Sequence, residues 1–257
     1  MRKPGKKPRS VAEPQREPVA ETAPTLAPAA ETSSDPNGER GEATRQKLLT
    51  AAIDVFGQYG FDGTTTRALA SAAGVNLQAI PYYFGGKEGL YLATADHLAT
   101  LITSHLGERR RQVQARLAEI AAEGRPISRD EARALLTTLL HTIAEVMVSE
   151  RSRAWARFII REQMTPTEAF SRVYEAVMQP MLEAVRRLVG VLLDDAPTSE
   201  RVRLRALSLV GSIMVFRVAN AAALRQLEWA EMGPRELDAI RDLVAEIVRS
   251  IDRGVVG

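Results

Sequence analysis

The chain has 257 residues, of which 45% are hydrophobic, and its formal net charge is only +2. This length allows one or two domains with a packed core, and no run of about 18 apolar residues predicts a membrane-spanning helix. The absence of cysteine excludes disulfides, thiolate zinc sites and cysteine nucleophiles, and it fits a reducing compartment, so we expect a cytoplasmic protein.

Residues 1 to 41 hold seven of the thirteen prolines and few apolar side chains. Such a segment cannot bury enough surface to offset its ordering entropy, so we expect a disordered leader. Its first ten residues carry five basic side chains and no acid. They could form a phosphate-binding arm, or they could be a solubilising leader or a misassigned start.

Residues 42–90 predict three short helices. Leu48 to Phe56 recur at helical spacing, and Gly60 ends that first helix. Thr64 to Thr66 offer caps for a helix through about Ala73, Gly74 turns the chain, and Asn76 caps a helix over 77–83. Two short helices joined by a tight turn have helix-turn-helix proportions, and the second of them enters the DNA major groove.

Residues 91–257 continue as helices in a second domain. A long helix runs from about Glu88 to Ala122, and Ser128 with Glu131 makes a capping box for the next one. Further helices are expected at about 129–149, 152–164, 167–193, 198–225 and 234–252, with Pro or Gly between most of them. The fold class is therefore all-α, with an N-terminal helix-turn-helix domain and a helical C-terminal domain.

The stretch "GVNLQAIPYYFGGKEGLY" contains the candidate DNA contacts. Gln78 can bond adenine through two hydrogen bonds, and the Pro81 ring offers an apolar face to a thymine methyl group. The hydroxyl groups of Tyr82 and Tyr83 and the ammonium group of Lys87 can reach phosphates, although Tyr82 could instead belong to the core. The candidate DNA-binding residues are Thr65, Thr66, Arg67, Asn76, Leu77, Gln78, Ala79, Pro81, Tyr82, Tyr83 and Lys87.

The sequence "TRQKLLTAAIDVFGQYGFDGTTTRALASAAGVNLQAIPYYFGGKEGLYLA" resembles the DNA-binding domain of TetR-family transcriptional regulators. "AIPYYFGGKEGLY" and "WARFIIREQMTPTEAFSRVYEAVMQP" are similar to the CecR/YbiH-like subgroup, and Pro81 replaces a tyrosine usual in the family. The resemblance implies a homodimeric repressor that binds a palindromic operator in double-stranded DNA and is released by a small-molecule effector. It also implies DNA contacts at Thr66, Arg67, Leu77, Gln78, Ala79, Pro81, Tyr83 and Lys87.

The second domain offers a candidate dimer interface and a candidate ligand pocket. The interface residues, repeated at helical spacing in two helices, are Val202, Leu209, Ile213, Leu237, Ile240, Val244, Ile247 and Ile251. The same pattern also suits an intramolecular core. The candidate pocket residues, which combine apolar walls with polar anchors, are Trp155, Phe158, Arg161, Met214, Arg217 and Asn220. Arg161 and Glu162 equally suit a structural ion pair.

Two other functions compete with a regulator. A helical enzyme would need a nucleophile or an acid–base pair, and we find none, so we expect no catalytic residues. The three histidines stand apart without metal-ligand spacing, so we expect neither a metal nor a cofactor. A non-specific DNA-binding or adaptor protein remains the alternative, although residues 42–90 carry no basic excess.

Overall fold

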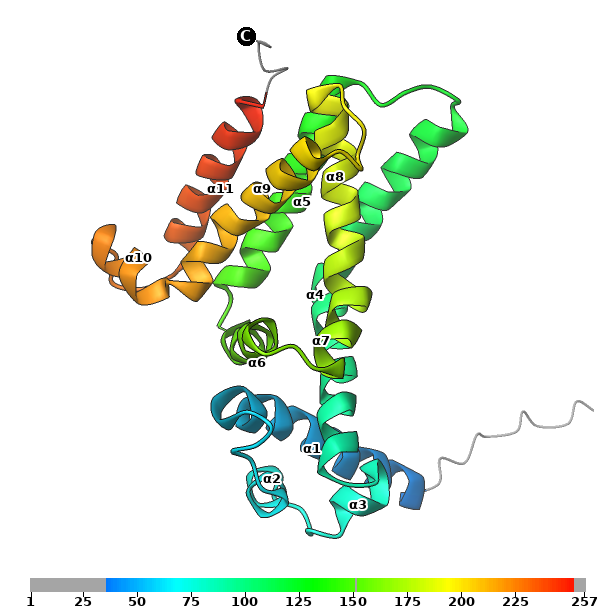
Figure 1. Cartoon of the computed structure of the whole chain (residues 1–257), viewed down its shortest axis with the longest axis vertical. Helices are drawn as coiled ribbons and strands as arrows, with labels where there is room; N and C mark the ends of the chain where they lie inside the picture. The colour runs from blue at the N-terminus through cyan, green and yellow to red at the C-terminus, as the bar shows by residue number, and fades with distance from the viewer. Residues whose placement is uncertain (1–35, 151, 252–257) are drawn as a thin grey trace, which may run out of the picture.

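The computed structural model describes residues 36–150 and 152–251. Within these ranges every regular element is a helix, so the predicted all-α class is confirmed (Figure 1). The predictions for residues 1–35 and for 252 lie outside the described residues. Residues 36–41, which we predicted to be part of a disordered leader, instead form the beginning of the first helix. Proline is favoured at the first position of a helix, which accounts for a start at Pro36.

Three helices form a small head at the N-terminal end of the molecule. They are α1 (Pro36–Tyr59), α2 (Thr66–Ala73) and α3 (Ala79–Phe84). As predicted, α1 ends at Gly60, whose φ of 74° lies in the left-handed region that glycine adopts without strain. The head packs around fully buried Leu48, Phe56, Leu69 and Ile80.

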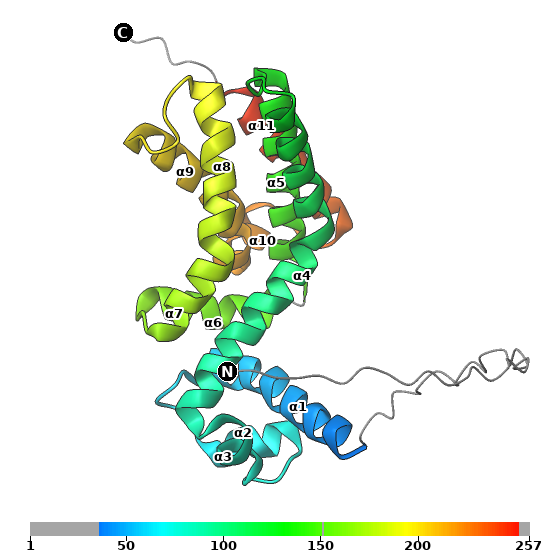
Figure 2. The same cartoon turned by 90° about the vertical axis from the view of Figure 1, so that its right-hand side faces the viewer.

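One long helix, α4 (Lys87–Ala122), connects the head to the rest of the chain. Figure 2 shows it leaving the head and running along the second domain. Its first turns contribute Leu90 and Tyr91 to the core of the head, whereas Val113 and Leu117 belong to the core of the second domain. The helix continues through Gly107 without a break.

The second domain contains the remaining helices. They are α5 (Arg129–Val148), α6 (Ser152–Met164), α7 (Glu168–Val173), the π-helical turn η1 (Tyr174–Met178), α8 (Gln179–Leu193), α9 (Glu200–Val218), α10 (Asn220–Gln226) and α11 (Pro234–Arg249). The predicted capping box starts α5, since the Glu131 amide donates to the Ser128 hydroxyl at 3.2 Å and the Ser128 amide donates to Glu131 at 3.1 Å.

The predicted helix over 198–225 is divided, because the chain bends by 86° between α9 and α10. Among the described residues no single helix is long and apolar enough to cross a membrane, although α9 and α10 together satisfy the length and composition.

The core of the head extends past the boundary that we predicted after residue 90. Buried Trp155 and Phe158 of α6 and Val173 of α7 belong to the same cluster as the head residues. Helix α6 therefore lies directly on α1, with the rest of the second domain on its other side (Figure 1). This arrangement makes α6 a shared wall between the two parts of the molecule.

Candidate DNA-binding surface and effector cavity

The turn between α2 and α3 is fixed by local hydrogen bonds. The Thr65 hydroxyl accepts from the Ala68 amide at 3.1 Å and caps α2, as predicted. Gly74 adopts φ 63°, which ends α2. Asn76 does not directly precede the helix as we expected. Its Oδ1 accepts from the Gln78 amide at 2.8 Å, and α3 begins two residues later than predicted, at Ala79.

The later start of α3 explains how the helix accommodates a proline. Pro81 is the third residue of α3. The first four amides of a helix have no acceptor within it, so the missing N–H of a proline there removes no helical hydrogen bond. The position therefore avoids most of the penalty of about 3 kcal/mol for proline in a helix interior.

Most candidate DNA contacts lie on one exposed surface of the head. Those classed as exposed are Thr65, Arg67, Asn76, Leu77, Gln78, Pro81 and Tyr82, whereas Thr66, Ala79, Tyr83 and Lys87 are half-buried. Tyr82 is 80% exposed, which decides against the core alternative for this residue. The side chain of Gln78 has no partner among the described residues and is available to a base edge.

A shallow groove beside α3 adds two residues that the sequence analysis missed. Thr44 and Lys47 of α1 line it together with Asn76, Gln78 and Pro81. They lie three residues apart on the outer face of α1, and their spacing would have indicated a shared face. The Tyr83 ring packs close to Gly41 of α1, where an added Cβ would lie 3.2 Å from the tyrosine hydroxyl.

Lys87 does not occupy the position that we predicted for it. Its ammonium donates to the carbonyls of Phe61 at 2.9 Å and Thr64 at 3.0 Å, and it lies 4.2 Å from the centre of the Phe61 ring. Two of its three donors are therefore satisfied inside the head. Lys87 thus joins the start of α4 to the loop after α1, and we expect this role for it in place of the predicted phosphate contact.

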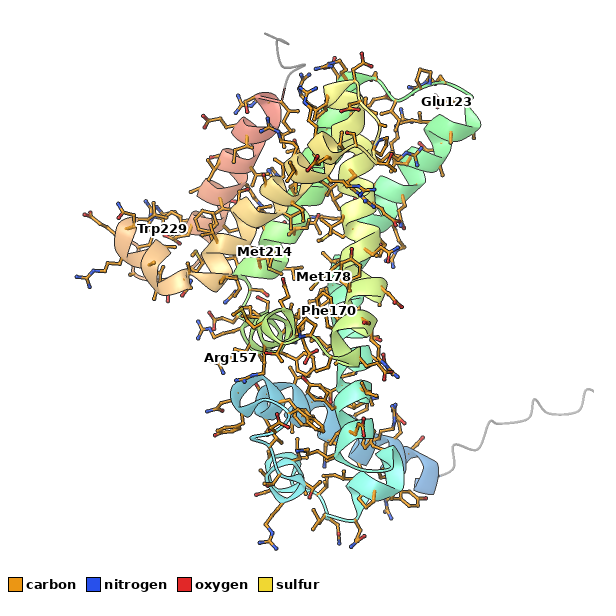
Figure 3. All side chains as sticks on the ribbon, viewed as in Figure 1. Glu123, Arg157, Phe170, Met178, Met214 and Trp229 are labelled. Carbon is orange, nitrogen blue, oxygen red and sulfur yellow. The ribbon has the colours of Figure 1, made fainter. Side chains whose placement is uncertain are left out.

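An apolar cavity of about 390 Å³ lies in the second domain. Helices α4 to α9 contribute to its wall, and α6 separates it from the head. Figure 3 shows Phe170, Met178 and Met214, from three different elements, gathered around this region. The volume falls within the range of pockets that enclose small organic ligands.

Three of the six predicted ligand residues line this cavity, namely Trp155, Met214 and Arg217. The other three do not. Phe158 faces the head and packs 5.2 Å from the Tyr91 ring, and Arg161 donates to the Gln58 carbonyl of α1 at 3.2 Å. Asn220 bonds the Phe216 carbonyl at 3.3 Å. Nor does Arg161 pair with Glu162 among the ion pairs of the described residues.

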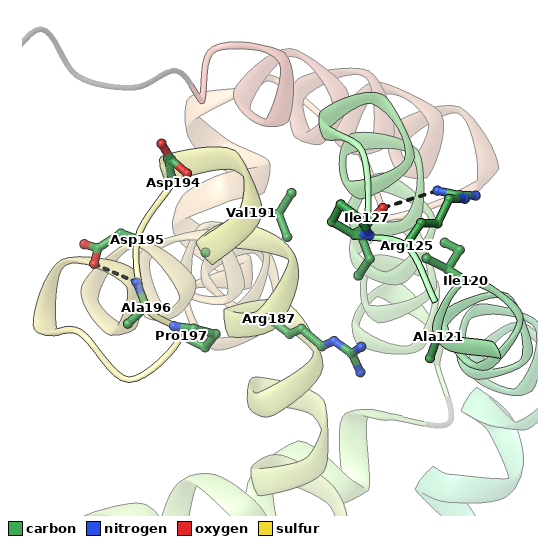
Figure 4. Close-up of a pocket in the computed structure, with 12 residues that line it drawn as sticks. Ile120, Ala121, Arg125, Ile127, Arg187, Val191, Asp194, Asp195, Ala196 and Pro197 are labelled. Atoms are coloured by element: carbon green, nitrogen blue, oxygen red, sulfur yellow. Dashed lines mark hydrogen bonds between the residues drawn. The ribbon is translucent and has the colours of Figure 1, made fainter. Parts of the chain in front are cut away.

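A second, more open cleft lies at the far end of the domain, between the end of α4 and the end of α8 (Figure 4). Two of its charged groups already have partners within the chain. Arg125 pairs with Glu131 at 2.7 Å, and Asp195 accepts from the Ala196 amide at 2.7 Å. Figure 4 shows Asp194 and Asp195 pointing away from Arg187. The apolar cavity is therefore the better candidate for an effector.

The predicted dimer interface is wrong for most of its residues. Six of the eight are at most 3% exposed within the single chain: Val202, Leu209, Ile213, Ile240, Val244 and Ile251. Leu237 and Ile247 also pack against that core. A side chain that its own chain already covers has no surface left to bury against a partner, so this face is the intramolecular core.

Buried polar contacts join α4, α6 and α7 where the head meets the second domain. The Tyr91 hydroxyl donates to Glu162 Oε1, and the other carboxylate oxygen accepts from the Thr167 hydroxyl at 2.8 Å and amide at 3.1 Å. Tyr91 and Glu162 are 5% and 3% exposed. Burial raises the pKa of the Tyr91 phenol, and the hydrogen bond to Glu162 raises it further.

Two family models match separate parts of the chain. Residues 48–94 match the bacterial regulatory proteins of the tetR family, and residues 132–255 match the C-terminal domain of the HTH-type transcriptional dual regulator CecR. The CecR protein of Shigella flexneri is 31% identical over 205 residues, which cover 80% of this chain and 89% of that protein. The RutR regulator of Escherichia coli strain K12 is 44% identical over 59 residues, which cover 22% of this chain and 28% of that protein.

Solved structures share the fold at low sequence identity. A TetR-family regulator from Streptomyces coelicolor has a TM-score of 0.54 at 18% identity and covers 82% of this chain and 96% of that chain. FadR from Bacillus subtilis, in complex with stearoyl-CoA, has a TM-score of 0.52 at 15% identity, and the match covers 80% of this chain and 97% of that chain. Together, the two family models and the long match to CecR establish that the chain is a transcriptional regulator of the TetR family, not an enzyme, with a CecR-type C-terminal domain.

Proposed function

We propose that this protein acts as a homodimer that binds a palindromic operator and releases it when a small molecule enters the apolar cavity. The observation that carries the proposal is the position of α6. Trp155 and Ile159 of this helix line the cavity, while Phe158 belongs to the core of the head. A molecule that moves α6 therefore also acts on the helices that carry the DNA-binding surface.

The effector must favour the arrangement that cannot bind DNA. A ligand shifts an equilibrium only through its different affinities for the two states. In a dimer, the two copies of α3 must be spaced by about one turn of DNA, roughly 34–36 Å, to enter successive major grooves. A small displacement of α6 and α1 would change that spacing and weaken operator binding.

The exposed side of α9, two of whose residues (Gly211 and Val218) also border the apolar cavity, supports a dimer interface in place of the one predicted from sequence. Leu204, Val215 and Val218 are 59%, 47% and 55% exposed. With Ser208 and Gly211 they form a stripe with alternating spacings of four and three residues, the repeat by which two helices pack along one seam. The stripe is apolar at its ends and small in its middle, which suits a two-fold contact with a second copy.

The solved FadR structure is described with stearoyl-CoA bound, so this fold can hold a small molecule with a long apolar part. For the present chain, the cavity volume and its apolar wall support binding of a small molecule in the same general way.

The test is a selection of bound fragments from a randomised DNA library by the purified protein at fixed, near-physiological salt. Enrichment of a palindrome with half-sites about one turn apart is the expected result. Retention of all sequences alike, displaced equally by any competitor DNA, would instead support the non-specific adaptor and reject the operator-binding regulator.

A further inference from the structure

The wall of the effector cavity is apolar except at a few points. Among the described residues that line it, Arg217 carries the single charge, and Ser152, Gln163 and Tyr174 supply the uncharged polar groups. Within 36–150 and 152–251, no aspartate, glutamate, lysine or histidine lines the cavity. The preference of the cavity for an anionic, neutral or cationic molecule therefore depends mainly on one guanidinium group.

Arg217 is held in place by backbone groups, and its charge is not neutralised by an acid. Its Nε donates to the Met147 carbonyl and its Nη2 to the Ser149 carbonyl at 2.8 Å, at the end of α5. Among the ion pairs of the described residues, none includes Arg217. The remaining nitrogen, Nη1, is left without a protein partner in these bonds.

The surroundings of Arg217 make an anion favourable beside it. Burial lowers the pKa of the guanidinium, and the charge of nearby Arg153 lowers it further, although Glu150 has the opposite effect. A half-buried cation that has lost part of its hydration gains most from a partner of opposite charge. Arginine also presents its donors in a fixed fork that matches a carboxylate.

We infer that the effector of this protein is an amphipathic organic anion, whose acidic group binds Arg217 and whose apolar body fills the space between α6, α7 and α9. This inference rests on the proposed function, since it names the chemical class that the same cavity accepts. The aromatic and methionine side chains, such as Trp155, Phe170 and Met178, form a wall that adapts to an apolar body. A cationic molecule would bring a second positive charge to Arg217.

The experiment compares three probes with the same ten-carbon chain and different charge. Decanoate, 1-decanol and decyltrimethylammonium are titrated into the full chain by calorimetry, below the concentrations at which they form micelles. We expect decanoate to bind at least tenfold more tightly than 1-decanol, and decyltrimethylammonium to bind most weakly. Equal binding of decanoate and 1-decanol, a preference for the cation, or failure of decanoate to bind would overturn the inference.

Substitutions of Arg217 then test whether this residue causes the preference for the anion. Arg217→Gln is expected to bind decanoate and 1-decanol equally, whereas Arg217→Lys keeps a weakened preference for the anion. Arg205→Gln is the matched control, because Arg205 lies on the same helix, is exposed and does not line the cavity. Persistence of the full anion preference in Arg217→Gln would refute the assignment. The three-probe order in the unaltered protein remains decisive if that variant does not fold.

The DNA selection separates this inference from the proposed function. An Arg217-dependent preference for decanoate without any enriched DNA motif would reject operator binding and leave the anion site standing. An enriched palindrome together with equal affinity for the three probes would reject the anion site and leave the regulator standing.

Discussion

Removal of the Tyr91 hydroxyl tests whether the junction between the head and the second domain is stabilised by the buried bond to Glu162. In Tyr91→Phe the ring and its packing against Phe56 and Phe158 remain, but Glu162 Oε1 loses its donor. A buried hydrogen bond that involves a carboxyl group contributes about 1.5–3 kcal/mol. We therefore expect the free energy of unfolding to fall by about 2 kcal/mol, and the Tm by roughly 4–8 °C for a chain of this size.

The matched control is Tyr59→Phe, because the Tyr59 side chain is 54% exposed and its hydroxyl has no partner among the described residues. That change is expected to stay within about 0.5 kcal/mol. Unfolding is followed by circular dichroism in urea and by heating. If Tyr91→Phe were as stable as Tyr59→Phe, the bond would add nothing to stability and the reasoning about this junction would be refuted.

The pH dependence of stability gives a second, independent reading of the buried Tyr91 phenol, because burial and, to a smaller degree, the bond to Glu162 raise its pKa. Because burial and then Glu162 raise the pKa of Tyr91 in the folded chain, its unfolded value near 10 is the lower one. The contribution of the protonated Tyr91 phenol to the free energy of unfolding is therefore complete below about pH 10. It is lost as the pH rises further, by at most about 1.4 kcal/mol per pH unit. Tyr91→Phe should remove this alkaline loss. An unchanged slope above pH 10 would show that another group causes it.

Three further substitutions test the DNA-binding surface and the dimer. Gln78→Ala should relax base preference at one position of each half-site, by about 1–3 kcal/mol in a repeated library selection; an equal loss on all sequences would make Gln78 a positioning residue. Lys87→Met should lower stability by about 1–3 kcal/mol and leave the salt dependence of DNA binding unchanged, since its ammonium bonds two carbonyls; a salt slope shallower by about 1 would restore the phosphate role. Val215→Glu should give a monomer in sedimentation while Leu227→Glu, at a residue exposed outside the stripe, should not; an unchanged dimer would move the interface elsewhere.

Local sequence signals predicted the helices of this chain well. Caps and breakers act within one turn, so Thr65, Gly74 and the Ser128–Glu131 pair could be identified without knowledge of the fold. The start of α3 was missed by two residues because Asn76 closes a turn ahead of the helix instead of capping it directly. Both asparagine geometries satisfy the same backbone amides, and the sequence does not distinguish them.

The faces of the helices could not be assigned from sequence in the same way. Helix α9 has two apolar stripes, one through Val202, Leu209 and Ile213 and the other through Leu204 and Val215. Both repeat at alternating spacings of three and four, so periodicity alone cannot tell which one its own chain covers. The first is buried against α5 and α8, and the second is exposed. The prediction chose the covered stripe because its residues also matched those of the last helix.

The residues that line the cavity could not be assigned from sequence for the same reason. Trp155 and Phe158 are three residues apart in α6, are chemically similar and both belong to the core cluster of the head, but only Trp155 also borders the cavity. This difference depends on which helices pack against each side of α6. Similarly, a lysine at position 87 has the reach to meet either a phosphate or the carbonyls of Phe61 and Thr64, and only the fold shows the second.

The close contact between α1 and α6 supports the proposed coupling between the apolar cavity and the DNA-binding surface. An added Cβ at Gly57 of α1 would lie 3.3 Å from the Arg157 Cβ and 3.4 Å from the Ala154 carbonyl oxygen of α6. Backbones this close leave no layer of side chains to absorb a displacement, and packed interiors shift between discrete arrangements more readily than they compress. We therefore expect a ligand that displaces α6 to move α1 with it. Coupling energies between allosteric sites are typically about 1–3 kcal/mol, which corresponds to a change of roughly 5–150-fold in operator affinity. Gly57, which permits this contact, and the Tyr91–Glu162 bond between α4 and α6 both join the cavity wall to the head, and we expect the proposed coupling to depend on both.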